Sequence, residues 1–221
     1  DQEITSAMES ALADGLISAA VALHYPFPLG VTTIGRVLTP AKGRPLLIAA
    51  STGMSATSRI EALVRNAVYG VAVAKALGME KPTVGVLNLD GAASVQRALA
   101  RMAESGYSIN FADSVRADGG CLLRGNDLLA GAADVCVCDT LTGNVLMKLF
   151  SAFNTGGGFE ALGWGYGPSV GENWGKIVGI ISRASGAPVI ANALCYTASL
   201  IRGRLVQCVE AELASARSAG L

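Results

Sequence analysis

This chain of 221 residues has little histidine, few aromatic side chains and no excess charge of either sign. Its only histidine is His24, so a zinc site is poorly supported and we expect no metal. The 17 basic and 17 acidic residues cancel, which argues against a surface built for nucleic acid or for an anionic membrane. No apolar run approaches the roughly 20 residues that a membrane-spanning helix needs. We therefore expect no nucleic-acid partner and no membrane span.

The five cysteines show no disulfide framework, and we expect no signal peptide. Cys136 and Cys138 are two residues apart, so on a strand their side chains would point the same way as small buried groups. A reducing cytoplasm is the expected compartment. The chain begins at Asp1 without an initiator methionine, so we expect an N-terminal part of the functional unit to be missing.

Hydrophobic residues make up 51% of the chain and the mean hydropathy is +0.45, values that favour a sheet buried on both faces. Strand-like and helix-like patterns alternate, which predicts an α/β fold: a mostly parallel sheet with helices on both faces, in three layers, forming one domain over 1–221. The expected strands are 17–23, 45–50, 83–89, 107–111, 135–138 and 188–191, and the expected helices are 4–16, 59–77, 92–104, 145–153, 174–185 and 196–218. The run 31–38 fits either a short helix or a strand.

The most informative segment places a short apolar run, 135–138, before small polar residues and a helical pattern at 145–153. A strand followed by a tight turn and a helix presents the helix N-terminus at the carboxyl edge of a sheet. Free backbone N–H groups and the positive end of the helix dipole favour an anion there. The predicted phosphate-binding residues of this segment are Thr142, Gly143 and Asn144, with Asp139 and Lys148 in supporting positions. A capped turn without any ligand is the alternative interpretation.

A second polar segment follows the expected strand 45–50. If its strand ends at the same sheet edge, its hydroxyl and backbone groups would complete a cradle for a dianion, because hydrogen bonds to an ionised group are about twice as strong as neutral ones. The residues predicted to bind phosphate here are Ser51, Thr52, Gly53 and Ser55. Asn88, which follows the expected strand 83–89, is a supporting candidate. His24 could serve as a base, although a structural histidine is the more usual outcome.

Three segments together resemble the phosphate acyltransferase family of phospholipid synthesis and its relatives, the phosphate acetyltransferases. They read PTVGVLNL at 82–89, INFADSV at 109–115 and DVCVCDTLTGNVLMK at 134–148. The sequence departs from the phospholipid enzymes at 22–26, 50–54 and 191–196, where their glycine-rich and Ser-His-Gly-type segments are replaced. The replaced segments, and the tail ALGWGYGP at 161–168 with SGAPVIANA at 185–193, are more similar to the alpha subunits of component C of the glycine/sarcosine/betaine reductase complex.

The resemblance implies a cytoplasmic acetyltransferase, found in anaerobic amino-acid fermentation, that converts an acetyl thioester and inorganic phosphate into acetyl phosphate. It also implies a thiolase-like partner subunit that receives the acetyl group first. We expect the protein to be an oligomer. A cysteine near the C-terminus is expected to carry the acetyl group, and Cys195 fits, because the sequence places it at the start of a helix where the dipole stabilises a thiolate. A buried structural cysteine is the alternative for Cys195, and Cys121 is the reserve nucleophile.

Two other functions stay open at this point. The chain could be a non-catalytic scaffold subunit that keeps the fold and binds a partner. It could also transfer long acyl chains from acyl carrier protein to phosphate, in which case an apolar tunnel should lie beside the phosphate site. None of these functions requires a metal or an organic cofactor.

Overall fold

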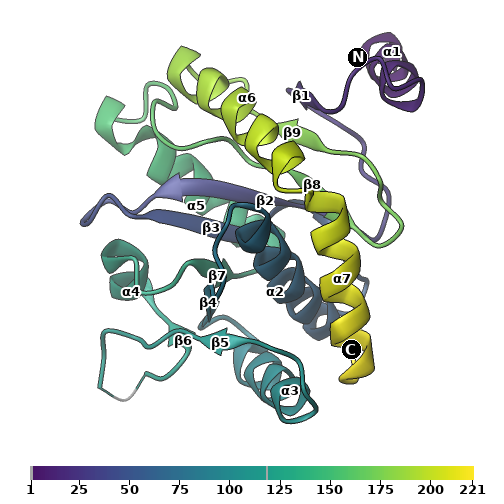
Figure 1. Ribbon diagram of the computed structural model, residues 1–221. Coiled ribbons are helices and arrows are strands. Elements are labelled where there is room, and N and C mark those ends of the chain that lie inside the picture. The colour runs from purple at the N-terminus through teal and green to yellow at the C-terminus, as the bar shows by residue number, and fades with distance from the viewer. Residues whose placement is uncertain (1, 118) are drawn as a thin grey trace.

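The computed structural model describes residues 2–117 and 119–221 (Figure 1). Its main sheet has the strand order β5-β4-β7-β3-β2-β8, with β6 paired to β4 beside that path. The strands of this sheet are β2 (Val31–Leu38), β3 (Pro45–Met54), β4 (Thr83–Leu87), β5 (Asn110–Phe111), β6 (Leu122–Leu123), β7 (Val135–Val137) and β8 (Ser169–Gly171). All pairs among β3, β4, β5, β6 and β7 are parallel, whereas β2 is antiparallel to β3 and β8. The predicted α/β fold with a mainly parallel sheet is confirmed.

Seven α-helices and one short 3-10 helix are present among the described residues. They are α1 (Gln2–Ala13), α2 (Arg59–Ala76), α3 (Ala92–Glu104), α4 (Gly125–Ala130), α5 (Thr140–Ala152), the 3-10 helix η1 (Phe153–Thr155), α6 (Ala187–Arg202) and α7 (Leu205–Ser218). The helices over 59–77 and 92–104 are therefore confirmed within one residue. None of the helices in the described part of the chain is both long and apolar enough to cross a membrane.

Alternate residues along the central strands fill two separate cores, one on each face of the sheet. On β7, Val135 and Val137 enter the core built from α2, α3 and α7, whereas Cys136 enters the core that α4 and α5 cover. Both thiols of the Cys136 and Cys138 pair are buried, as the spacing predicted. The sheet thus forms the middle of three layers.

A small second sheet stands apart from the main one. It consists of β1 (Ala20–Ala22) and β9 (Val178–Ile180), which run parallel. Helix α6 lies beside these two strands, and α1 lies at their outer end (Figure 1). No residue of α1 is fully buried.

The sequence prediction failed in the C-terminal third. The segment predicted as a helix over 174–185 contains strand β9, and the run 188–191, predicted as a strand, opens α6. Pro188 lies in the first turn of α6, where its missing N–H costs nothing, so a short apolar run that fits either structure becomes helical here. The helix predicted over 196–218 is two helices, α6 and α7. They separate at Gly203, where a Cβ would lie 1.7 Å from the Ala76 carbonyl oxygen.

Strand β3 runs four residues further than the apolar pattern indicated. It includes Ser51, Thr52 and Gly53 and ends at Met54, because the antiparallel strand β2 pairs with this polar part as far as Val31. The register of the β2–β3 pair shifts between Thr33 and Ile34, as it does at a β-bulge. The polar segment after residue 50 is therefore a strand rather than a loop, and the ambiguous run 31–38 is its partner strand.

Candidate functional site

The start of α5 is closed by the protein itself. Asp139 is the N-cap, and its carboxylate accepts hydrogen bonds from the Thr142 backbone amide (3.0 Å) and the Thr142 hydroxyl (2.7 Å). The Gly143 amide donates to the Asp139 carbonyl at 2.9 Å. The prediction that Thr142, Gly143 and Asn144 form a turn before the helix was wrong, since all three lie within α5. Their occupied amides and the capping carboxylate argue against an anion at this helix end.

The hydrogen bonds at this cap favour the ionised form of the Asp139 carboxyl. Burial alone would raise the pKa of its carboxyl, but the amide and hydroxyl of Thr142 and the guanidinium of Arg59 bring the pKa below its ordinary value. Asp139 therefore stays ionised at neutral pH and neutralises the dipole that an anion would otherwise meet. The sequence predicted Asp139 in a supporting position, with a capped turn as the alternative, and in the structure Asp139 is the helix cap.

Gly143 allows α5 to pack closely against β3. A Cβ at this position would lie 1.8 Å from the Ala50 carbonyl oxygen, so only glycine lets α5 lie this close to β3. The close approach brings the Asn144 side chain to β3, where its Nδ2 donates to the Ser51 carbonyl at 3.2 Å.

The two predicted serines are enclosed. Ser51 is fully buried, and its hydroxyl bonds to the Tyr166 carbonyl and to the Thr33 hydroxyl. Ser55 is 5% exposed and donates to Asn66 Oδ1 at 2.7 Å. The Ser51 hydroxyl joins β3 to its neighbours, and the Ser55 hydroxyl joins the residue after β3 to α2, so neither hydroxyl is free to bind phosphate. Asn88 is exposed at the end of β4, but it lines neither of the two hollows found near the strand ends.

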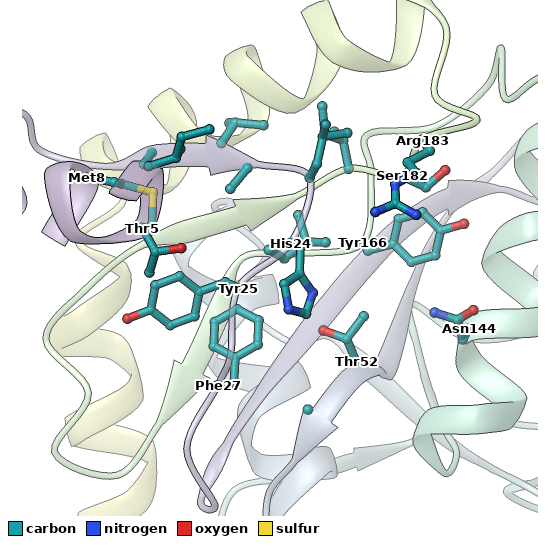
Figure 2. Close-up of a pocket in the computed structure, with 18 of the residues that line it drawn as sticks. Thr5, Met8, His24, Tyr25, Phe27, Thr52, Asn144, Tyr166, Ser182 and Arg183 are labelled. Carbon is teal, nitrogen blue, oxygen red and sulfur yellow. The ribbon is translucent and has the colours of Figure 1, made fainter. Parts of the chain in front are cut away.

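The main cavity opens beside the end of β3 and has a volume of about 980 Å³ (Figure 2). Four predicted site residues line it together: Thr52 and Gly53 from β3, and Asn144 and Lys148 from successive turns of α5. The polar end is completed by His24, Tyr166, Ser182 and Arg183. Figure 2 shows Arg183, Tyr166, Asn144, Thr52 and His24 around one opening.

Two cationic side chains, those of Lys148 and Arg183, line the cavity. Lys148 projects from the third turn of α5, and Arg183 projects from the turn between β9 and α6. The Lys148 ammonium lies 5.0 Å from the centre of the Tyr166 ring and is 2.8 Å from Glu160 Oε1. Arg183 and Ser182 escaped the sequence prediction because a helix was expected there.

The opposite wall of the cavity is apolar. It includes Met8 of α1, Leu23 and Phe27 from the segment between β1 and β2, and Ile180 of β9. The Tyr25 hydroxyl at this wall donates to Glu9, and burial together with this carboxylate raises the pKa of Tyr25 to about 12. The cavity therefore joins a cationic, hydrogen-bonding end to an apolar end, which is the general character of a small-molecule site.

The two candidate nucleophiles lie outside this cavity. Cys195 belongs to the third turn of α6 and is exposed, so its predicted position at a helix start was wrong. The strand expected before it is the first turn of α6, which moves the thiol about 12 Å along the helix from its N-terminus. Cys121 is 5% exposed, and burial raises the pKa of its thiol, which disfavours the thiolate that a nucleophile needs.

Comparison with known proteins places the chain in a family. The model of the fatty acid synthesis protein family matches residues 1–221. The chain is 53% identical, over its whole length and 57% of the relative, to the glycine/sarcosine/betaine reductase complex component C subunit alpha of Peptoclostridium acidaminophilum. It is 32% identical over 123 residues to the phosphate acyltransferase of Acetivibrio thermocellus, covering 53% of this chain and 33% of that protein. The chain thus spans little more than half the length of the first relative and a third of the second.

The fold has a counterpart among solved structures. A branched-chain phosphotransacylase from Enterococcus faecalis V583 superposes with a TM-score of 0.58 over 87% of this chain and 76% of that one, at 16% sequence identity. This likeness supports the fold alone. The chain therefore belongs to the fatty acid synthesis protein family, with the resemblance to component C alpha subunits and phosphate acyltransferases that its motifs predicted.

Proposed function

We propose that this chain carries the phosphate site of an acetyltransferase that forms acetyl phosphate from an enzyme-bound acetyl thioester. The observation that carries the proposal is the polar end of the 980 Å³ cavity, where Lys148 and Arg183 lie among neutral hydrogen-bonding groups. Cations and amide or hydroxyl groups are the partners that a phosphate dianion prefers. The similarity to a component C alpha subunit supports the acetyl group as cargo.

The reaction needs positioning more than activation, because phosphate is already a competent nucleophile. A phosphate oxygen attacks the thioester carbonyl carbon and forms a tetrahedral oxyanion. The carbon–sulfur bond then breaks, the thiolate takes the proton that phosphate carried, and acetyl phosphate is left. Lys148 and Arg183 would hold the phosphate. Asn144 Nδ2 also donates to the Ser51 carbonyl, and its second hydrogen would donate to the developing negative charge.

Cys195 is the proposed acetyl carrier. Among the five cysteines it alone is exposed, so a thiolase-like partner subunit could reach it. Because Cys195 does not line the cavity, the acetyl group could reach the phosphate by two routes. Either the acetyl group passes over Cys195, or the partner's thioester is presented directly to phosphate in the cavity.

A substitution at Cys195 separates these versions. Purified protein with its partner subunit should catalyse arsenate-dependent loss of acetyl phosphate. We expect Cys195→Ser to abolish this loss, while Cys208→Ser, a change in a half-buried thiol of α7, leaves it intact. Full activity in Cys195→Ser would assign the thioester to the partner. No turnover by the wild type with its partner would overturn the acetyl phosphate function.

A second function, transfer of a longer acyl chain to phosphate, is favoured by the apolar wall. The cavity reaches the upper part of the range of roughly 300–1,000 Å³ typical of drug-sized ligands, which leaves apolar space beside a bound acetyl phosphate. A series of acyl phosphates from two to sixteen carbons tests it. Activity that rises with chain length would favour the long-chain reaction, and activity that falls beyond two carbons would favour acetyl.

If the chain is only a scaffold subunit, we expect it to bind neither phosphate nor acetyl phosphate. A phosphate site should raise the melting temperature of the protein as phosphate or acetyl phosphate is added, because ligand binding to the native state stabilises it. No shift with either anion would favour a subunit that only binds partners.

A further inference from the structure

A buried carboxylate lies directly behind the polar end of the cavity. Glu160 is 1% exposed, and it follows the glycine-rich segment after η1. Its Oε1 accepts from the Lys148 ammonium at 2.8 Å and from the Tyr166 hydroxyl, and its Oε2 accepts from the Ser185 hydroxyl at 2.6 Å. A carboxylate removed from water is costly unless it is paired and hydrogen-bonded, and here three donors satisfy it.

The backbone of Glu160 supports the other cation. Its amide donates to the Ala184 carbonyl at 2.8 Å, and its carbonyl accepts from the Gly186 amide at 2.9 Å. These bonds hold both sides of the turn that carries Arg183 into the cavity. Within this turn the Ser182 amide donates to the Ser185 hydroxyl at 3.0 Å, and the same hydroxyl donates onward to Glu160.

Tyr166 connects the cluster to the sheet. Its hydroxyl donates to Glu160, and its backbone carbonyl accepts from the buried Ser51 on β3. Burial would raise the pKa of the Glu160 carboxyl, but the donors Lys148, Ser185 and Tyr166 keep the pKa below its ordinary value. Glu160 therefore remains a fixed negative charge across the neutral range, anchored to the sheet, α5 and the turn before α6.

We propose that Glu160 is a positioning residue for the anion end of the cavity, which orients Lys148 directly and Arg183 through the 182–185 turn. Glu160 does not line the cavity, so it acts only through these two cations. The inference rests on the proposed function in taking phosphate as the anion. Without Glu160, Lys148 on α5 and the turn carrying Arg183 lose their shared support, so the positions of the two cations in the cavity wall are no longer fixed together.

A second buried carboxylate provides a matched control. Glu212 on α7 is 8% exposed and accepts from Lys75 and from the Tyr107 hydroxyl, and none of these three residues lines the cavity. Each of these two glutamates therefore pairs with one lysine and one tyrosine. A change of either residue to glutamine removes the charge and keeps the shape, so a general cost of disturbing a buried carboxylate should fall on both variants.

The first experiment compares Glu160→Gln with Glu212→Gln in the full-length protein with its partner subunit, by varying inorganic phosphate. Because hydrogen bonds to charged groups are the strong ones, we expect Glu160→Gln to raise the KM for phosphate about tenfold while kcat changes less than about threefold. Glu212→Gln should leave the KM for phosphate unchanged, even if it lowers the melting temperature. An unchanged KM in folded Glu160→Gln would overturn the proposal.

The second experiment needs no turnover. Trace labelling with acetic anhydride, read by mass spectrometry, reports how freely each lysine reacts. Release of one hydrogen bond should increase the labelling of Lys148 about fivefold in Glu160→Gln, while Lys176, which pairs with Glu9 elsewhere, serves as the internal reference. Equal Lys148 labelling in both proteins would overturn the positioning role. Increased labelling in a protein that forms no acyl phosphate would retain that role and reject the proposed function.

Discussion

The first turn of α5 faces one hollow and the next two turns face another, and we propose the anion site in the second hollow only. At the first turn, a hollow of about 260 Å³ is lined by Asp139, Thr140 and Arg59, and the Asp139 carboxylate occupies the helix amides. Further along the helix, Asn144 and Lys148 line the cavity of about 980 Å³. The difference shows that a helix N-terminus does not make an anion site by itself. A capping carboxylate takes the donors and cancels the dipole, so side chains further along have to supply the site.

The largest expected effect concerns the contact that holds both hollows in place. Gly143→Ala forces a Cβ against the Ala50 carbonyl oxygen, 1.8 Å away in the present geometry, so α5 has to move away from β3. We expect a loss of about 3 kcal/mol in the free energy of unfolding, at the upper end of overpacking costs, measured by urea denaturation. Gly125→Ala in α4 is the control, because a Cβ there meets nothing within 4 Å. An equal loss in both variants would contradict the close-packing role of Gly143.

The next effect tests whether the cavity, rather than the helix start, binds phosphate. Asn144→Asp places a negative charge among the cavity residues, and repulsion between charges near a protein surface is worth about 1–4 kcal/mol at about 4 Å. The KM for phosphate should rise about tenfold or more, which corresponds to about 1.4 kcal/mol. Asn88→Asp, the same change at an exposed residue outside the cavity, should leave the KM unaltered. A larger rise in the KM for phosphate in Asn88→Asp than in Asn144→Asp would indicate that phosphate binds at the end of β4.

The smallest effect concerns the cap. Asp139→Ala should reduce stability by about 1 kcal/mol, the usual cost of losing an N-cap, because the Thr142 amide loses its acceptor. It should leave the KM for phosphate near the wild-type value. A marked decrease in that KM would show that the helix start binds phosphate once its carboxylate is removed. That result would contradict the proposal that only the cavity binds phosphate.

The cap also has a pH dependence with a defined sign. The pKa of Asp139 is lower in the folded protein than its ordinary value, so its stabilisation is complete above about pH 4 and is lost as the pH falls through the folded pKa. The stability difference between wild type and Asp139→Ala should therefore narrow in acid. Chemical denaturation at pH 7 and at pH 3 measures it, and a difference that widens at pH 3 would contradict the assigned shift.

Long periodic elements could be predicted from the sequence, whereas short ambiguous runs could not. The helix over 92–104 has a clear apolar stripe ending at Gly106, and the structure has it at those residues. The run 188–191 is apolar enough for a strand and short enough for a helical turn, and in the structure it forms the first turn of α6, where Pro188 is well tolerated. That error displaced Cys195 from a helix start and hid Arg183 inside an expected helix.

Part of the candidate site followed from local pattern. The polar residues after 135–138 and 45–50 lie on or beside α5 and β3, and four of them, Thr52, Gly53, Asn144 and Lys148, line one cavity. Ser51 and Ser55 could not be separated from Thr52 in advance, because side chains alternate along a strand and only the partner strand β2 shows that β3 continues there.

The amino-acid sequence determined the α/β alternation, the buried strands of the sheet and the family, because hydrophobic periodicity and short motifs are local properties of the chain. Tertiary structure alone decided which polar groups remain available to a ligand. Asp139 satisfies one helix end, and the hydroxyls of Ser51 and Ser55 bond within the protein. Lys148 and Arg183, which are 35 residues apart in the sequence, line the same cavity. Hydrogen-bond partners and burial depend on contacts between distant parts of the chain, so the local pattern could not decide these outcomes.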